Sequence, residues 1–252
     1  MSNALGGRVA LVTGASRGIG AAIAARLAAH GATLSVHYRS GSDEARAVQE
    51  SLPGSGHSRI EADVADPAGA RHMVESTVER HGRLDILVNN AGIFSAHPPL
   101  ETSWEDWLAT WERTVSTNLL GPAHACFWAA RHMVAGGRIV NIGSRGAYRG
   151  EPNAPAYGAA KAGLHQLTQS LAVALAPKGI SVFGVAPGFV ETAMARPHLQ
   201  GAAGDAVRAQ SPFDRVATVD EVAYWVACAC MPEAAFASGA IIDVNGASYL
   251  RS

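Results

Sequence analysis

The sequence has little cysteine, no excess of either charge, and no apolar run as long as a membrane span. Its three cysteines, Cys126, Cys228 and Cys230, are an odd number, and the Cys-x-Cys pair has no histidine or cysteine partners nearby. This pattern matches neither a disulfide framework nor a zinc site. We therefore predict no metal site and expect the cysteines to be small core residues.

Charge and hydropathy exclude further classes of protein. Lys and Arg together number 20 and Asp and Glu 21, so there is no overall field of the kind that attracts nucleic acid or an anionic membrane. Residues 1–7 lack a basic segment followed by a long apolar run. We expect a cytoplasmic protein with no nucleic-acid partner and no membrane association.

The 252 residues, 48% of them hydrophobic, can bury one substantial core. No repeat, low-complexity tract or linker divides the chain, although residues 193–214 form a segment containing Gly, Ala and Pro. We therefore expect a single domain over residues 1–252.

Short β-branched apolar runs predict seven strands, at 9–12, 33–36, 59–61, 84–88, 138–142, 181–185 and 240–244. Ala-rich segments with apolar residues three and four apart separate these runs and predict helices. Strands that are apolar throughout are typical of a parallel sheet covered on both faces. The predicted fold class is α/β: a doubly wound, Rossmann-type fold with a mainly parallel seven-stranded sheet flanked by helices on both faces.

The segment T-G-A-S-R-G-I-G, residues 13–20, follows the first predicted strand and runs into an Ala-rich helix. Its glycines, Gly14, Gly18 and Gly20, let the backbone approach a pyrophosphate, and the helix N-terminus offers free N–H groups. The spacing differs from G-x-G-x-x-G, and glycine-rich turns also close ordinary connections. The strand before and the helix after favour nucleotide binding.

The second predicted strand ends in His37-Tyr38-Arg39, without the carboxylate that NAD binders use for the ribose 2′-hydroxyl. Arg39 offers a planar fork suited to phosphate, and Arg17 lies in the glycine loop. A single arginine would more often be a solvated surface charge. Two converging cations without an acid predict NADP(H) over NAD(H).

A second group of polar residues follows the fifth predicted strand. Tyr157 and Lys161 are four residues apart in a helical segment and so share one helix face. An ammonium about 4 Å from a phenol would lower its pKa by about 3 units at an effective dielectric of ~20. Ser144 closes the strand at the edge where ligands bind in such folds. Alone, Tyr-x-x-x-Lys is more often a surface pair.

Together these motifs resemble the short-chain dehydrogenase/reductase family, in its single-domain branch, over residues 8–247. Asp63-Val64 is similar to the family's adenine contact, residues 89–92 to the turn after its fourth strand, and Pro187-Gly188 to its nicotinamide site. The implied cofactor-binding residues are Gly14, Ser16, Arg17, Gly18, Ile19, Gly20, Tyr38, Arg39, Asp63, Val64, Asn90, Ala91, Gly92, Tyr157, Lys161, Pro187, Gly188, Val190 and Thr192. The resemblance also implies a substrate lid at about 189–214.

The same resemblance implies a catalytic tetrad of Asn118, Ser144, Tyr157 and Lys161. Tyr157 would protonate the carbonyl oxygen, Ser144 would hydrogen-bond that oxygen, and Lys161 would bind the nicotinamide ribose and bias Tyr157. Asn118 would position a water that relays protons to Lys161. Preplaced donors of this kind stabilise negative charge as it develops on oxygen. Asn118 could instead merely bend a helix.

The predicted function is hydride transfer between NADP(H) and a carbonyl or secondary alcohol, with ketone reduction favoured. Residues 13–20 and 38–40 resemble those of 3-oxoacyl-[acyl-carrier protein] reductases and their relatives. The alternative is a non-catalytic NADP(H)-binding sensor or regulatory subunit on the same fold. The intact tetrad argues against that alternative.

The substrate is a small carbonyl or alcohol whose identity is left open. Apolar and aromatic residues that fit many ketones are Phe94, Tyr148, Phe189, Met194, His198 and Leu199. Arg145 and Arg149 could meet an anionic group or equally be exposed without a role. Gly143 replaces a serine found in many members, and the long stretch 93–117 is expected to hold a helix that docks Trp104, Trp107 and Trp111.

The family resemblance further implies a homotetramer, with a dimer as the other possibility. Such assemblies pair the helices that hold Asn118 and Tyr157, and also the last strand. The apolar run 241–244 and Tyr249-Leu250 are compatible with that burial.

Overall fold

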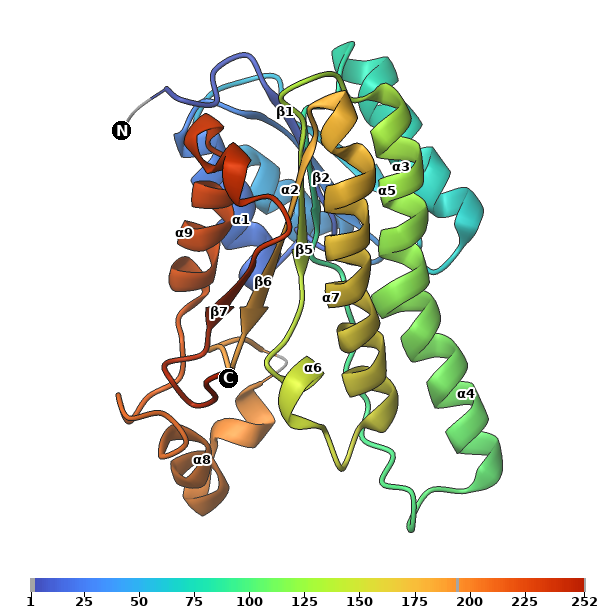
Figure 1. Cartoon of the computed structure of the whole chain (residues 1–252), viewed down its shortest axis with the longest axis vertical. Coiled ribbons are helices and arrows are strands. Elements are labelled where there is room, and N and C mark those ends of the chain that lie inside the picture. Colours follow the sequence, from blue (N-terminus) through green and yellow to red (C-terminus); the bar gives the residue numbers. More distant parts are fainter. Residues whose placement is uncertain (1–2, 194, 252) are drawn as a thin grey trace.

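Seven parallel strands form one sheet in the computed structural model, which describes residues 3–193 and 195–251, without the side chains of 197 and 198 (Figure 1). The strands are β1 (Val9–Val12), β2 (Thr33–Tyr38), β3 (Ser58–Glu61), β4 (Ile86–Asn89), β5 (Arg138–Ile142), β6 (Ser181–Pro187) and β7 (Ile241–Val244). Their order is β3-β2-β1-β4-β5-β6-β7, and every neighbouring pair is parallel. The predicted doubly wound sheet is confirmed.

Helices cover both faces of this sheet, as Figure 1 shows. One face carries α1 (Gly18–Ala29), α2 (Ser42–Ser51) and α9 (Val219–Cys230). The other carries α3 (Pro67–His81), α5 (Gly121–His132) and α7 (Pro155–Leu175), with α4 (Trp104–Val115) continuing beyond α5. The short helices α6 (Gly146–Arg149) and α8 (Gly201–Arg208) lie beyond the carboxyl ends of the strands.

Continuously apolar strands supply both cores at once. In β1, Ala10 and Val12 pack in the core with Ile23 of α1, whereas Leu11 packs in the other core with Met73 of α3. All five side chains are fully buried. Burying a side chain the size of leucine contributes about 1.5–3 kcal/mol, so a polar residue at any strand position would lose one of these contacts. This is why the strands lack alternation.

The cysteines and the tryptophans met the expectations only in part. Cys126 and Cys230 are buried and free, and burial raises the pKa of each thiol to about 12, as expected of core residues. Cys228 is only half-buried. The stretch 93–117 does form a helix, α4, but Trp104 is 65% exposed instead of docked. Among the described residues, no helix is long and apolar enough to span a bilayer.

Candidate active site

A cavity of about 440 Å³ lies at the carboxyl ends of the strands, and we call it the main cavity. It is lined by every predicted cofactor-binding residue and by Ser144, Tyr157 and Lys161. Asn118 is buried and does not line the cavity. In an open α/β sheet this edge, where the strand order reverses between β1 and β4, is the usual ligand site.

The glycine loop between β1 and α1 is shaped by close backbone approach. Gly14 has a positive φ of 62°, and a Cβ there would lie 3.0 Å from the Cα of Ala91. A Cβ on Gly20 would collide with the Gly14 carbonyl oxygen. The first turn of α1 has no side-chain cap, so its N–H groups remain available to a phosphate. The loop therefore fits a dinucleotide.

His37 holds this loop in place, and the sequence reasoning missed it. Its Nδ1 accepts a hydrogen bond from Gly14 N–H at 3.1 Å, and its Nε2 lies 3.1 Å from the Ala62 carbonyl oxygen. Nδ1 must be unprotonated to accept, which matches the burial that lowers the pKa of His37 to about 4. His37 belongs to the His37-Tyr38-Arg39 segment at the end of β2, but its role in holding the glycine loop becomes visible only from its hydrogen bond with Gly14.

Thr13 and Asn90 join the loop to the turn after β4. The Thr13 hydroxyl accepts hydrogen bonds from the N–H groups of Asn90 and Ala91, both at 2.9 Å. The Asn90 side-chain amide donates to the carbonyl oxygens of Thr13 and Gly14. The two segments predicted to contact the cofactor are thus one hydrogen-bonded unit.

The two predicted cations lie on the wall of the main cavity. Arg17 is exposed, and Arg39 lies 3.9 Å from the carboxylate of Asp63, with both side chains about half exposed, at 51% and 45%. Such an exposed, long ion pair contributes little. Arg39 therefore keeps most of its capacity for a phosphate.

Ser144 and Tyr157 are in contact at the far end of the cavity. Tyr157 stands in the first turn of α7, with its ring edge-to-face against Phe94 at 5.1 Å between centroids. The Ser144 hydroxyl accepts a hydrogen bond from Gly146 N–H at 3.0 Å, so its own proton is directed elsewhere. Its hydrogen bond to Tyr157 acts to lower the pKa of the phenol.

The expectation that Lys161 lowers the pKa of Tyr157 is wrong in this structure. Burial raises the pKa of Tyr157, and the Ser144 hydrogen bond opposes that effect only in part. The Lys161 ammonium donates to the carbonyl oxygen of Ile142 at 2.7 Å and lies 5.8 Å from the Tyr157 ring centroid. The expectation ignored desolvation of the phenol, which is the largest effect. Burial lowers the pKa of Lys161 itself to about 8.

Asn118 lies behind the cavity in a π-helical turn, Ser116–Leu120, where α4 meets α5. Its side-chain amide donates to the Ile93 carbonyl oxygen at 2.8 Å and accepts from Ile93 N–H at 2.9 Å. Its Oδ1 and the Lys161 Nζ both lie beside Gly92, at 3.3 and 3.6 Å from where a Cβ would stand. Asn118 is thus near Lys161, and single-turn π-helices are frequent at functional sites.

Gly143 and His165 explain one departure from the family pattern. A side chain on Gly143 would collide with the imidazole of His165, which occupies that space from α7. The Nε2 of His165 lies 3.4 Å from the backbone nitrogen of Ser144, and burial lowers the pKa of His165 to about 4. The space of the missing serine is filled by a neutral histidine behind Ser144.

The segment after β6 closes over the glycine loop. Thr192 lies against Gly18, with 3.7 Å between its Cγ2 and the position of a Gly18 Cβ. Val190 forms an isolated bridge with Ala217. Of the predicted substrate residues here, Met194 and the side chain of His198 lie outside the described residues. Tyr148 and Leu199 do not line the main cavity, whereas Phe94 and Phe189 do.

Arg145 is buried and Arg149 is exposed, and both guanidinium groups are hydrogen-bonded within the chain. Arg145 is 4% exposed, and its guanidinium donates to the Ser248 hydroxyl and the Gln210 side-chain oxygen. Arg149 donates to the same Gln210 oxygen at 2.9 Å. Both arginines therefore tie Gln210 to the residues after Ser144, and Arg145 also ties the C-terminal loop to them through Ser248.

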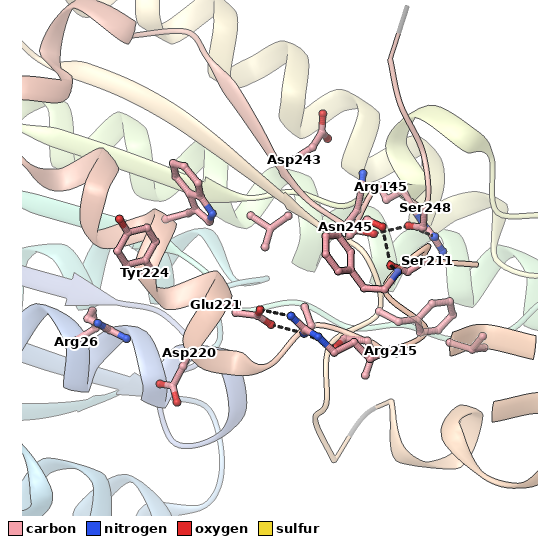
Figure 2. A pocket seen from close by; sticks show the side chains of 18 residues that line it. Arg26, Arg145, Ser211, Arg215, Asp220, Glu221, Tyr224, Asp243, Asn245 and Ser248 are labelled. Atoms are coloured by element: carbon pink, nitrogen blue, oxygen red, sulfur yellow. Dashed lines mark hydrogen bonds and ion pairs between the residues drawn. The ribbon is translucent and has the colours of Figure 1, made fainter. Parts of the chain in front are cut away.

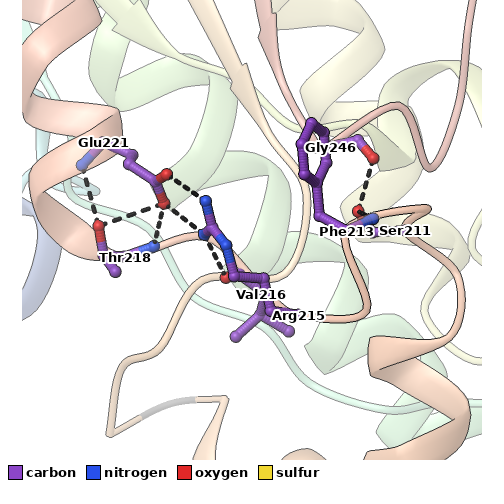
Figure 3. Close-up of polar contacts among 7 residues, drawn as sticks. All are labelled: Ser211, Phe213, Arg215, Val216, Thr218, Glu221 and Gly246. Atoms are coloured by element: carbon purple, nitrogen blue, oxygen red, sulfur yellow. Dashed lines mark hydrogen bonds and ion pairs between the residues drawn. The ribbon is translucent and has the colours of Figure 1, made fainter.

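A second cavity, the outer cavity, has a volume of about 460 Å³ and lies between β7, α9 and the segment after α8 (Figure 2). Arg215 pairs with Glu221 through two hydrogen bonds, at 2.6 and 2.8 Å. Thr218 and Glu221 form a reciprocal capping box at the start of α9, and Ser211 donates to the Gly246 carbonyl oxygen (Figure 3). The carboxylate of Glu221 is thus fully paired within the outer cavity.

Further lining residues of the main cavity were not among the predicted cofactor-binding or catalytic residues, although Phe94 and Phe189 were predicted to contact the substrate. They are His37, Ser40, Ile93, Phe94, Thr117, Ile142, Gly143, Arg145, Gly146, Glu151, Phe189, Ala193 and Ala195. Most are neighbours of predicted residues at strand ends. Glu151 differs, because no motif singled out this residue itself.

Comparison with known proteins identifies the family. The model of enoyl-(acyl carrier protein) reductase matches residues 14–247. The chain is 38% identical over 246 residues to the 3-oxoacyl-[acyl-carrier-protein] reductase of Escherichia coli, covering 97% of this chain and 98% of that one. It is 38% identical to the cis-4-hydroxycyclohexanecarboxylate dehydrogenase of Sinomonas cyclohexanicum, covering 98% of each.

A solved structure agrees with these relatives. It is a short chain dehydrogenase from Burkholderia cenocepacia in complex with NADP, with a TM-score of 0.89, 40% identity, and coverage of 97% of this chain and 99% of that one. Sequence and fold therefore agree over nearly the whole length. The chain belongs to the short-chain dehydrogenase/reductase family and is an oxidoreductase that acts on CH–OH and C=O groups.

Proposed function

We propose that the protein is an NADP(H)-dependent ketone reductase in which Tyr157 gives its phenolic proton to the carbonyl oxygen. The observation that carries this proposal is the contact of Ser144 with Tyr157 beside the buried ammonium of Lys161, at one end of the main cavity. A bound nicotinamide supplies or accepts the hydride. The protein's task is then to hold the carbonyl and exchange one proton.

Each residue of the tetrad has a distinct part in this proposal. Ser144 donates a hydrogen bond to the carbonyl oxygen, since its hydroxyl oxygen is already occupied by Gly146 N–H. Tyr157, with a raised pKa, holds its proton until negative charge develops on that oxygen. Lys161 holds the nicotinamide ribose, and Asn118 keeps the backbone at Ile93 in place beside it.

NADP(H) is proposed over NAD(H) because Arg17 and Arg39 are the cations on the cavity wall beside β2. The only carboxylate near Arg39 among the residues that the structure describes here is that of Asp63, and the pair is long and exposed. A 2′-phosphate would gain charge-assisted hydrogen bonds from both guanidinium groups. The relative from Burkholderia cenocepacia binds NADP, which supports the same choice.

The test is the oxidation of NADPH and of NADH, followed by absorbance against a panel of ketones. We expect turnover with NADPH that the Tyr157→Phe variant loses. Turnover that survives in this variant would contradict the role of Tyr157. NADPH binding without turnover of any ketone or alcohol would favour the non-catalytic sensor.

We also propose a cytoplasmic homotetramer. Exposed apolar side chains support assembly: Leu120 and Phe127 on α5 and the turn before it, Val173 on α7, and Tyr224 and Trp225 on α9 beside the edge strand β7. Apolar faces and open sheet edges of this kind are usually covered. Three free cysteines are compatible with a reducing compartment. Sedimentation velocity would show whether the mass is that of four chains, two or one.

A further inference from the structure

One charged group of the main cavity has no part in the reaction proposed above. Glu151, in the loop between α6 and α7, lines the cavity and is half-buried. Among the described residues its carboxylate forms no hydrogen bond and no ion pair. An acceptor that is partly removed from water without a donor costs free energy that the fold does not recover.

The carboxylate lies beside the reacting groups. A Cβ on Gly146 would collide with its Oε1, so the absence of a side chain at Gly146 makes room for it. Gly146 is the residue whose N–H holds the Ser144 hydroxyl. The Cβ of Glu151 lies 3.6 Å from where a Cβ on Gly158 would stand, next to Tyr157. Its charge also contributes to the raised pKa of Tyr157.

The nearest cations do not neutralise this carboxylate. Arg145 and Arg149 direct guanidinium N–H groups to Gln210, and Arg145 also donates to Ser248. Both arginines act on Glu151 only through space, and burial raises the pKa of its carboxyl against their effect. The acceptor oxygens of Glu151 therefore remain open to whatever occupies the cavity.

We propose that Glu151 is a specificity-determining residue that accepts a hydrogen bond from a donor group of the substrate, a hydroxyl or an ammonium close to the carbonyl. The substrate class is then a hydroxyketone or aminoketone rather than a plain alkyl ketone or an anionic one. This inference rests on the proposed function. A site built to bind a substrate donor discriminates strongly against analogues that lack it, because its own polar group is left unpaired.

The experiment compares three ketones that differ in one group: 2-hydroxyacetophenone, 2-aminoacetophenone and propiophenone. Hydroxyacetone, aminoacetone and butanone repeat the comparison on a smaller scaffold. The kcat/KM of each is measured with NADPH for the wild type, Glu151→Gln and Glu151→Leu. Glu50→Gln on α2 removes an exposed carboxylate remote from the cavity and serves as the matched control.

For each hydroxyketone or aminoketone, the kcat/KM is divided by that of propiophenone. We expect Glu151→Leu to lower this ratio at least about tenfold and Glu50→Gln to leave it unchanged. Glu151→Gln, nearly the same size as the wild type, should lose most of the preference for the ammonium and less of that for the hydroxyl. Its result decides the matter if the leucine variant does not fold.

The outcomes separate this inference from the proposed function. Ratios that change less than about twofold in both Glu151 variants, while the wild type reduces the ketones, overturn the role of Glu151 alone. An equal loss on all ketones also overturns it, because that result assigns Glu151 to Tyr157 or to the fold. A wild type that reduces none of the six ketones counts against the proposed function, and the inference fails with it.

Discussion

The main cavity and the outer cavity have nearly equal volumes, about 440 and 460 Å³, and both contain arginines, carboxylates and aromatic rings. They differ in how those polar groups are satisfied. In the outer cavity Glu221 accepts from Arg215 and Thr218, whereas in the main cavity Glu151 has no such donor. Size and composition therefore do not distinguish a site from a surface hollow. What distinguishes the main cavity is that Ser144, Tyr157 and Lys161 meet the glycine loop there.

The charges of Glu221 in the outer cavity and Lys161 in the main cavity have opposite effects on the stability of the fold. The paired Glu221 has a pKa lowered to about 2, first by its hydrogen bond to Arg215, so its charge stabilises the fold above pH 4.5 and that contribution is lost as the pH falls toward 2. Burial lowers the pKa of Lys161 to about 8, so the fold disfavours its charge. The main cavity holds a destabilising charge, and the outer cavity a stabilising one.

The largest expected effect is that of Tyr157→Phe, which should lower kcat about 1000-fold because it removes the proton donor and keeps the ring against Phe94. The measurement is NADPH oxidation with a ketone that the wild type reduces. The matched variant in the outer cavity, Tyr224→Phe, should stay within about twofold of the wild type. A comparable loss in both variants would abolish the distinction between the cavities.

Lys161→Met should change the pH dependence of stability. The unfolded chain binds more protons than the folded one between pH 8 and 10.5, so wild-type stability rises with pH across that window. The free energy of unfolding of the wild type relative to the variant should increase there by up to about 3 kcal/mol. Urea unfolding at several pH values measures it. Parallel curves for the two proteins would show that Lys161 is not desolvated.

The combined variant Arg17→Ala, Arg39→Asp should shift the ratio of kcat/KM for NADPH and NADH about 100-fold toward NADH, about tenfold for each guanidinium group that no longer binds the 2′-phosphate. Steady-state kinetics with both cofactors measures this ratio. Arg26→Ala combined with Arg215→Asp removes two arginines of the outer cavity and should leave the ratio unchanged. An unaltered ratio in the first variant would reject the assignment of the 2′-phosphate.

The smallest effect is expected for Thr218→Ala, which removes the cap of α9. It should lower the stability by about 1 kcal/mol. For a chain of this size that corresponds to a Tm lower by about 2–4 °C. Thermal unfolding measures the loss, and kcat/KM should be retained. A decrease in kcat/KM larger than the decrease in the folded fraction would connect the outer cavity to the reaction.

The parts of the site that were predictable from sequence are those set by local backbone. The glycine loop, the strand ends and the i,i+4 spacing of Tyr157 and Lys161 each lie within one short segment, and the main cavity gathers them as expected. The role of His37 was hidden, because it depends on a hydrogen bond to Gly14 across two strands. Glu151 was hidden too, because its place depends on the missing side chain of Gly146.

The two arginines after Ser144 show the limit most clearly. Their spacing gave no means of choosing between an anion site and a solvated surface. In the structure Arg145 instead forms hydrogen bonds with Gln210 and with Ser248, which is 103 residues away in sequence. Partners this distant in sequence are chosen by the packing of the whole chain.

The sequence by itself determined the doubly wound sheet, because continuous apolar strands separated by helices have few other ways to bury both faces. It also determined the family, through motifs whose residues are neighbours along the chain. Tertiary structure alone decided the electrostatics of the site. Desolvation and through-space charge depend on what surrounds a group, so the raised pKa of Tyr157 and the unpaired carboxylate of Glu151 exist only once the chain has folded.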